Sequence, residues 1–289
     1  MRRLLTLLAL TWAGPAWAEA ELLGRLSLSG APAFIGVSGL EVSADGTEAW
    51  LLTDKGLLSR AILSRDGDRL SGIELHDTHA LLFHTGEPLQ DFWTDSEGLA
   101  MPPEGPFFVS FERHARVMEY PAPDAASTWL PRPPEIAAMN GNGGPEALAI
   151  DAGGALYLLQ EDAGGADTAP IWRFADRATG WQPVFDYRRD GAFYPSGADF
   201  GPDGRLYVLE RAFINFRFAV QVRRLDLATG TDEVVLRTAR GVEGNLEGLA
   251  VWRDAAGATR LLLVTDNNGL DRQRNEIVEY RLTEPGPRG

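Results

Sequence analysis

The sequence contains no cysteine. This absence excludes disulfide bonds, metal sites built from thiolates, and a cysteine nucleophile. Disulfides are not needed for stability, because a chain of 289 residues with 44% hydrophobic side chains can bury a large core. The length accommodates one large β domain or two ordinary domains.

Long hydrophobic runs are also missing, apart from one near the N-terminus. The apolar run at residues 4–12 is too short to span a bilayer. Arg2 and Arg3 precede it, and Ala16-Trp17-Ala18 follows it with the small-x-small pattern of a signal peptidase site. We therefore predict a cleaved signal peptide over residues 1–18 and a protein that is periplasmic or secreted. We expect no membrane span in the rest of the chain.

Basic residues are scarce relative to acidic ones. The chain has 27 Lys and Arg against 41 Asp and Glu, which gives a formal net charge of −14. Nucleic acids and anionic membranes require a basic surface, so neither is an expected partner. The acidic balance fits bound cations, although it also fits a solvated surface that keeps the protein soluble. We expect a monomer that acts on a small anionic or ester substrate.

One unit recurs five times along the chain. Each copy begins with a Ser or Glu, continues with a small residue and an apolar run, and turns back into a second apolar run. The small residues are about 50 positions apart, a period typical of β-propeller blades. They are Gly39, Gly98, Ala147, Gly197 and Gly248.

Each unit predicts an antiparallel hairpin of two strands, called A and B here. Asp-Gly pairs such as Asp203-Gly204 supply the positive φ that a tight reversal needs. Two further strands complete a four-stranded blade, for example 220–227 and 233–236 in the fourth copy. We predict an all-β propeller over 19–289 as a single domain. Five blades are preferred, a sixth remains possible in the longer first interval, and residues 21–29 close the ring against 275–282.

The polar residues of the repeat gather at one end of this fold. Strands A and B are antiparallel, so the start of A and the end of B lie together. The A starts are Ser38, Glu97, Glu146, Ser196 and Glu247. The B ends are Asp54, Glu112, Glu161, Glu210 and Asp266.

This gathering of carboxylates predicts a site for Ca²⁺ or another divalent cation that prefers oxygen ligands. Two blades carry their acid at the fourth position of strand A instead of the first, at Glu41 and Asp199. We include these two with the other candidate metal ligands, which are Glu146, Glu247 and Asp266. The alternative is that each acid accepts backbone N–H groups of the next blade or pairs with an Arg.

Three residues are predicted to be catalytic. Glu97 lies among the acids, while Arg113 and Arg211 directly follow B-strand acids and can stabilise developing negative charge. Lys55, Asn142 and Asn267 are predicted to bind substrate. Asn142 lies in a Gly-rich stretch before the third strand A, and Asn267 extends the end of the fifth strand B.

Several of these strings resemble one known family in their order along the chain. They are Val37-Ser38-Gly39-Leu40-Glu41, Thr53-Asp54-Lys55-Gly56, Ser96-Glu97-Gly98-Leu99-Ala100, Asn245-Leu246-Glu247-Gly248-Leu249-Ala250 and Asp266-Asn267-Asn268. On these motifs the chain resembles the phytase-like family, described as having esterase-like activity of phytase. The resemblance covers nearly the whole chain after the signal peptide. It implies a β-propeller hydrolase but fixes neither substrate nor catalytic residue.

We therefore expect a periplasmic hydrolase of phosphoric or carboxylic esters, assisted by a divalent cation at one end of the central channel. Two alternatives stay open. The first is a non-catalytic propeller that acts as a binding module, since one fold hosts many functions. The second is a lactonase similar to the gluconolactonase and SMP-30 group, in which a Glu, Asn and Asp set surrounds one metal. Asp266-Asn267 is the closest match here to that set.

Overall fold

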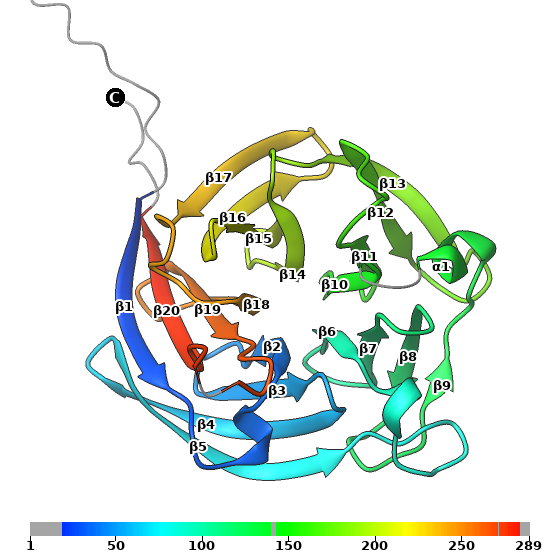
Figure 1. Cartoon of the computed structure of the whole chain (residues 1–289), viewed down its shortest axis with the longest axis horizontal. Coiled ribbons are helices and arrows are strands. Elements are labelled where there is room, and N and C mark those ends of the chain that lie inside the picture. The colour runs from blue at the N-terminus through cyan, green and yellow to red at the C-terminus, as the bar shows by residue number, and fades with distance from the viewer. Residues whose placement is uncertain (1–18, 140–142, 271, 284–289) are drawn as a thin grey trace, which may run out of the picture.

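The computed structural model describes residues 19–139, 143–270 and 272–283. Within these residues, twenty strands form five four-stranded antiparallel sheets arranged as blades around a central axis (Figure 1). The predicted five-bladed propeller is confirmed. None of the described helices is both long and apolar enough to cross a membrane. Residues 1–18 lie outside the described part of the chain, so the signal peptide stays a prediction.

The first three blades follow the chain without interruption. The first contains β2 (Val37–Val42), β3 (Glu48–Thr53), β4 (Leu57–Asp66) and β5 (Arg69–Ala80). The second contains β6 (Ser96–Ala100), β7 (Phe107–Phe111), β8 (Arg116–Tyr120) and the very short β9 (Thr128–Trp129). The third contains β10 (Pro145–Ile150), β11 (Leu156–Gln160), β12 (Thr168–Phe174) and β13 (Trp181–Arg188).

The last two blades complete the ring. The fourth contains β14 (Tyr194–Phe200), β15 (Leu206–Ile214), β16 (Arg217–Asp226) and β17 (Thr231–Arg237). The fifth contains β18 (Leu246–Arg253), β19 (Thr259–Thr265), β20 (Glu276–Thr283) and, on its outside, β1 (Glu19–Ser27). The short helices η1 (Pro32–Phe34), η2 (Asp91–Trp93) and α1 (Pro134–Ala138) lie in connections.

The longer first interval does not contain a sixth blade. A twelve-residue β5 takes up part of it. The rest is the connection from Leu81 to Asp95, which includes η2.

The small residue of each repeat lies where the innermost strands converge. A Cβ added at Gly98 would be 2.7 Å from the backbone nitrogen of Leu148 on the next blade. One added at Gly39 would be 2.9 Å from Leu99 Cβ. Real Cβ atoms do not approach other heavy atoms so closely, so the repeat requires glycine here. Ala147 is the one position of the five that accommodates a methyl group, and it is fully buried.

The hydrophobic core lies between neighbouring blades rather than along the channel. One cluster joins Tyr207 and Val222 of the fourth blade to Leu263 and Val278 of the fifth, all of them buried. Similar clusters fill the other junctions described. Because the apolar faces of the sheets are used in this way, the ends of the strands around the axis are free to carry polar groups.

The ring closes by pairing the two ends of the described chain. Strand β1 runs antiparallel to β20, with Ser27 opposite Glu276. Arg25 reinforces the pair, because its guanidinium donates to Glu276 at 2.6 Å and to the buried Glu243 at 2.7 and 2.8 Å. This closure leaves β20 with no free edge at the seam, as the sequence predicts.

Candidate functional site

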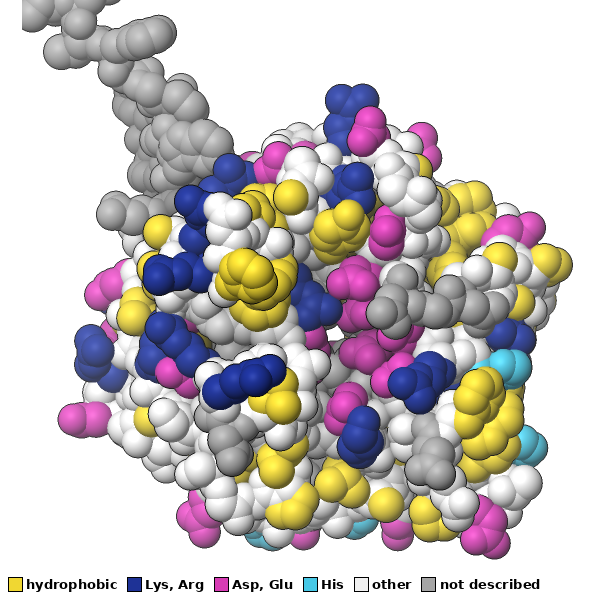
Figure 2. Space-filling view, in the orientation of Figure 1, with side chains coloured by type: hydrophobic (Ala, Val, Ile, Leu, Met, Phe, Trp, Pro, Cys, Tyr) yellow, Lys and Arg dark blue, Asp and Glu magenta, His cyan; other side chains and the backbone are white. Residues whose placement is uncertain are grey.

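The acids at the starts of strands A and the ends of strands B lie at one end of the channel. Figure 2 shows Asp and Glu side chains gathered at the centre of the ring on this face, with Lys and Arg side chains around them. The strand pairing explains the arrangement. Ser96 at the start of β6 pairs with Phe111 at the end of β7, which places Glu97 and Glu112 next to each other.

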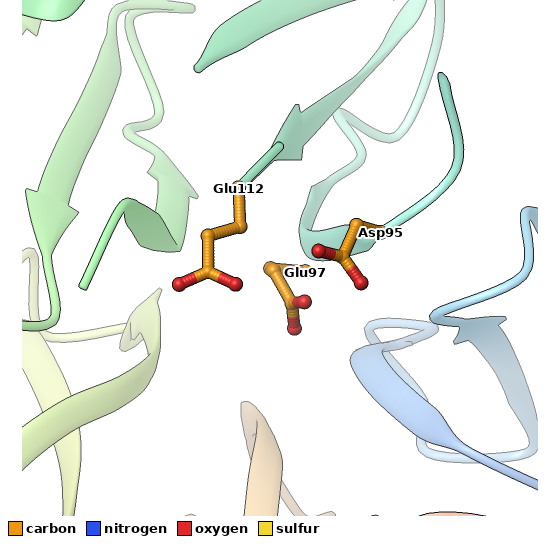
Figure 3. Close-up of side chains that lie close together, drawn as sticks. All are labelled: Asp95, Glu97 and Glu112. Carbon is orange, nitrogen blue, oxygen red and sulfur yellow. The ribbon is translucent and has the colours of Figure 1, made fainter. Parts of the chain in front are cut away.

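Three carboxylates of the second blade form the first group. One carboxylate oxygen from each of Asp95, Glu97 and Glu112 lies within 4.8 Å of the others. In Figure 3 the three side chains converge, with Glu97 between the other two. Asp95 has a left-handed backbone with φ 68°. Its N–H donates to Asp54 O at 2.7 Å, and its carbonyl accepts the N–H of Glu112 at 3.0 Å, so the backbone fixes its position.

A second group shares Glu112 with the first. Oxygens of Glu112, Glu146 and Glu161 also lie within 4.8 Å of one another. Glu112 accepts the backbone N–H groups of Gly143 at 2.6 Å and Gly144 at 3.3 Å. It therefore links the two groups and is held in place by the loop that enters β10.

Burial and mutual repulsion perturb these carboxyls. Burial raises the pKa of Glu97 well above its ordinary value, and the charges of Glu146 and Glu247 raise it further. Burial likewise raises the pKa of Glu146, although the charge of Arg211 opposes the shift. The pKa of Glu112 is also raised by burial, while its bonds to Gly143 and Gly144 lower it. Carboxylates this close need protons or a cation between them.

The residues present fit a hard divalent cation. Ca²⁺ takes six to eight oxygen ligands in flexible geometry, and carboxylates are its preferred protein ligands. Asp95, Glu97 and Glu112 offer such oxygens, and their side chains are only partly buried. The second group also contains Glu146, which is buried, and Glu161.

Arg211 contacts carboxylates on the other side of the channel. Its guanidinium contacts Glu247, donates to Asn245 Oδ1 at 2.5 Å and lies 3.2 Å from Glu161. Burial alone would lower the pKa of Arg211, but Glu247, Glu146 and Glu161 raise it above its ordinary value. Arg211 therefore neutralises this side and positions its acids.

Arg113 and Lys55 lie at the exposed rim. Arg113 Nε is 3.1 Å from Asp95, and its side chain is 60% exposed. Lys55 Nζ is 2.7 Å from Asp54, and its side chain is 69% exposed. Both cations can move toward an anionic group that approaches the first carboxylate group.

The remaining predicted residues are distributed unevenly. Glu247 and Asp266 lie next to each other, and burial raises the pKa of Glu247 to about 7. Asn267 is buried, and its Oδ1 accepts N–H groups of Gly36 at 3.1 Å and Gly269 at 3.2 Å. Its amide oxygen therefore holds the backbone. Asn142 lies outside the described residues.

Glu41 and Asp199 have a different environment. Glu41 accepts the N–H of Met101 at 3.0 Å, and Asp199 accepts the N–H of Val251 at 2.6 Å. Each thus binds the backbone of another blade, as in the alternative interpretation of the acids. Among the described residues, neither belongs to a group of three carboxylates able to share a cation.

Asp95, Glu112 and Glu161 are not among the ligands that the sequence predicts. The repeat places Glu112 and Glu161 at the correct end of the channel, as the ends of strands B. Asp95 precedes the repeat motif by two residues, and only the left-handed turn at this residue directs it toward the axis. The motif spacing contains no indication of that turn.

One family model matches most of the chain. The family model described as "Phytase-like: Esterase-like activity of phytase" matches residues 32–269. This range contains η1 and every strand from β2 to β19, including all the carboxylates above. No curated protein matches the sequence.

Solved structures with a similar fold share little sequence with this chain. The RRP9 WD40 repeats have a TM-score of 0.47 and 10% identity, covering 92% of this chain and 100% of that one. A gluconolactonase from Xanthomonas campestris has a TM-score of 0.49 and 14% identity, covering 86% and 72%. A catalytically inactive virginiamycin B lyase from Staphylococcus aureus has a TM-score of 0.45 and 13% identity, covering 92% and 100%. Similarity at this level carries no information on activity.

Proposed function

Because this chain belongs to the phytase-like family, described as having esterase-like activity of phytase, we propose that it is a periplasmic hydrolase of small anionic esters. The observation that carries the proposal is the convergence of Asp95, Glu97 and Glu112 beside the exposed Arg113. Phosphate esters are the preferred substrate class, since Arg113 and Lys55 offer cationic donors at the rim.

Each residue has a distinct role in this proposal. Asp95, Glu97 and Glu112 would hold a divalent cation such as Ca²⁺, which when bound supplies Lewis acidity toward an ester oxygen. Arg113 leaves its exposed contact with Asp95 and binds the anionic group of the substrate. Arg211 keeps Glu161 and Glu247 in place from the opposite side. Glu112 is oriented by its bonds to Gly143 and Gly144.

A non-catalytic binding module remains the second candidate. It is favoured by Arg211, whose contacts are with side chains of the protein itself, and by the backbone-binding roles of Glu41 and Asp199. Such a protein would bind a cation and an anionic ligand at the same place without turnover. A lactone belongs in the substrate panel, since the gluconolactonase-like alternative predicts its hydrolysis.

The test compares hydrolysis of a phosphomonoester, a short acyl ester and a lactone after treatment with EDTA and after addition of Ca²⁺. We expect Ca²⁺-dependent turnover of the phosphomonoester. Glu112→Gln should reduce it at least about tenfold by weakening cation binding. Glu104→Gln, which removes an exposed acid from the turn between β6 and β7, at the opposite end of the hairpin from the site, is the matched control and should retain activity.

Binding is followed separately by thermal unfolding. A cation that binds only the folded state at 100 times its Kd stabilises by about 2.7 kcal/mol, so the melting temperature should rise by about 5–10 °C. If Ca²⁺ raises the melting temperature but no ester is hydrolysed, the protein is a non-catalytic binding module and the hydrolase proposal fails. If Ca²⁺ changes neither quantity, the cation site and the hydrolase proposal both fail.

A further inference from the structure

An aromatic cluster, here called the aromatic shelf, lies on the second blade beside the first carboxylate group. It contains Phe83, His84, Phe92, Trp93, His114 and Trp129. The ring centroids of Trp93 and His114 are 4.9 Å apart, as are those of Trp93 and Phe83. Phe92 contacts Trp93 edge-on at 5.4 Å. The rings thus form one continuous aromatic surface.

The shelf is connected to the carboxylates by two short stretches of backbone. Trp93 precedes Asp95 by two residues, and His114 follows Glu112 by two residues. Two residues span at most about 7 Å of backbone, so the shelf residues and the carboxylate residues are attached close together on the same two segments. Figure 2 shows a hydrophobic patch with histidines at the rim, next to a cationic side chain and the acidic centre.

Arg116 connects the shelf to the two backbone segments that carry the carboxylates. Its side chain is almost fully buried, and its guanidinium lies 3.8 Å over the ring of Phe111. It donates to the backbone carbonyls of Trp93 and, at 2.7 Å, Arg113. One buried cation therefore ties the segment bearing Asp95 to the segment bearing Glu112, so the shelf and the carboxylates form one rigid unit.

The accessible surface of the shelf suits a flat apolar ring. Phe92 is 56% exposed, so one side of its ring is open to a ligand. Trp129 Nε1 donates to His84 Nδ1 at 3.2 Å, so its N–H is already used. A sugar would need free hydrogen-bonding groups around the stacking surface, whereas an aromatic ring needs only edge-to-face or offset contact.

We propose that the aromatic shelf is a specificity subsite that binds an aromatic ring in the alcohol part of the substrate. The preferred substrates are then anionic esters in which a ring lies a few bonds from the ester group held at Asp95, Glu97 and Glu112. The choice of these esters as substrates rests on the proposed hydrolase function. The ring-binding property of the shelf does not.

The kinetic test uses 2-phenylethyl phosphate and n-butyl phosphate. Both are esters of primary alcohols with similar leaving groups, so a difference in kcat/KM reports binding of the ring. We expect a preference of at least about tenfold for the phenyl ester. Phe92→Ala should bring this ratio close to one. Phe92→Leu, which keeps an apolar side chain but removes the ring, should give an intermediate ratio.

The matched control is Phe213→Ala. Phe213 is also an exposed phenylalanine, at 61%, and also contacts other aromatic rings, but it belongs to β15 on the fourth blade. The ratio of the two esters should not change in this variant. A ratio near one in the unmodified protein, or an equal fall in Phe213→Ala and Phe92→Ala, would overturn the proposal.

A binding measurement separates the shelf from the hydrolase function. Calorimetry in the presence of Ca²⁺ compares 2-phenylethylphosphonate with n-butylphosphonate, neither of which has an ester bond at this position to cleave. Tighter binding of the phenyl compound without hydrolysis of any ester supports the shelf and rejects the hydrolase. Hydrolysis of both phosphate esters at equal kcat/KM, with equal phosphonate Kd values, rejects the shelf and retains the hydrolase.

Discussion

Asp199 is a carboxyl that the fold keeps out of water. Burial raises its pKa to about 7, although bonds from the backbone N–H groups of Val251 and Phe200 lower it. Burial also raises the pKa of Glu41, and the charge of Asp199 raises it further. The two carboxyls therefore oppose each other's ionisation. In the unfolded chain an Asp ionises near pH 4 (about 3.9).

The pH dependence of stability follows from that difference. Between about pH 4 and pH 7, the folded state keeps a proton on Asp199 that the unfolded state has lost. Stability therefore falls as the pH rises through this window and stays reduced above it. Asp199→Asn removes the titrating group but keeps an oxygen that can accept the N–H of Val251. We expect its melting temperature at pH 8 to exceed that of the unmodified protein by about 5 °C.

The measurement is thermal unfolding at pH 4.5 and pH 8 in EDTA, so that no cation contributes. The difference between the two proteins should be much smaller at pH 4.5. Glu104→Gln removes one negative charge from the exposed surface and controls for net charge. Equal melting temperatures of Asp199→Asn and the unmodified protein at pH 8 would show that burial of this charge does not limit stability.

Individual residues show how much of the candidate site can be predicted from the sequence. The location of Glu97, Glu112 and Glu146 at one end of the channel follows from the repeat alone, because antiparallel pairing fixes which strand ends meet. The pairing of Arg211 with Glu247 does not follow from the repeat. The two residues lie on neighbouring blades, and the repeat does not specify which side chains meet across that junction. The position of Asp95 depends on a left-handed turn. Aspartate adopts this conformation more often than most residues, but one Asp in the sequence does not predict it.

At the scale of one element, the hairpin of β15 and β16 ends in a strained turn. Asn215 and Phe216 both have positive φ, at 52° and 61°. A turn with two such residues suits Asn followed by Gly, whereas a residue with a side chain at the second position costs about 1 kcal/mol. Phe216 is 93% exposed, so burial of its ring recovers little of that cost.

Replacing Phe216 by glycine should therefore stabilise the protein. We expect Phe216→Gly to raise the melting temperature by about 2–4 °C, measured by thermal unfolding. Phe216→Ala is the matched control, because it removes the ring but keeps the β-carbon that causes the strain. An equal gain in Phe216→Ala would mean that the exposed ring, and not the backbone, is the source of the instability.

The strands that belong to the repeat were predictable, and the strands outside it were predictable only in part. Strands A and B of every blade follow from the alternation of apolar residues and the turn residues between them. The outer strands vary, because they face solvent on one side and no converging neighbour limits their length. The second blade ends in a β9 of two residues, while β5 of the first blade has twelve. The connection that carries η2 and four of the six residues of the aromatic shelf has no counterpart among the other described connections.

At the scale of the whole molecule, stability depends on the closure by β1. Leu23 of β1 is 1% exposed, whereas its neighbour Leu22 is 42% exposed. A bulge between Leu22 and Gly24 sets this orientation. Leu23→Ala should cost about 3 kcal/mol by leaving a cavity in the seam, and Leu22→Ala less than about 0.5 kcal/mol.

Urea unfolding followed by tryptophan fluorescence and by circular dichroism measures both variants. We expect Leu23→Ala to shift the midpoint of a single transition in both signals, because opening the seam releases the whole ring. An early separate transition in Leu23→Ala would show that β1 detaches while the other strands stay folded. Similar midpoints for the two variants would contradict the orientation of this strand.

The pairing of the chain ends was predictable, because the last copy of the motif is incomplete. Five copies favoured five blades but left a sixth possible in the longer first interval, and the structure shows five. The location of the acids near the axis followed from the same repeated motif. The aromatic shelf was not predictable from the repeat. Its residues come from three segments that are separate in the sequence: two connections and one strand.

The closure by β1 has a consequence for synthesis of the protein. Arg25 and its partner Glu276 are 251 positions apart. A ribosome adding about 5–20 residues per second therefore completes β20 roughly 10–50 s after it has made β1. Throughout that interval the first strand lacks its partner, and the incomplete ring has an unoccupied flank at each end. The ring can therefore close only after translation has passed its last strand.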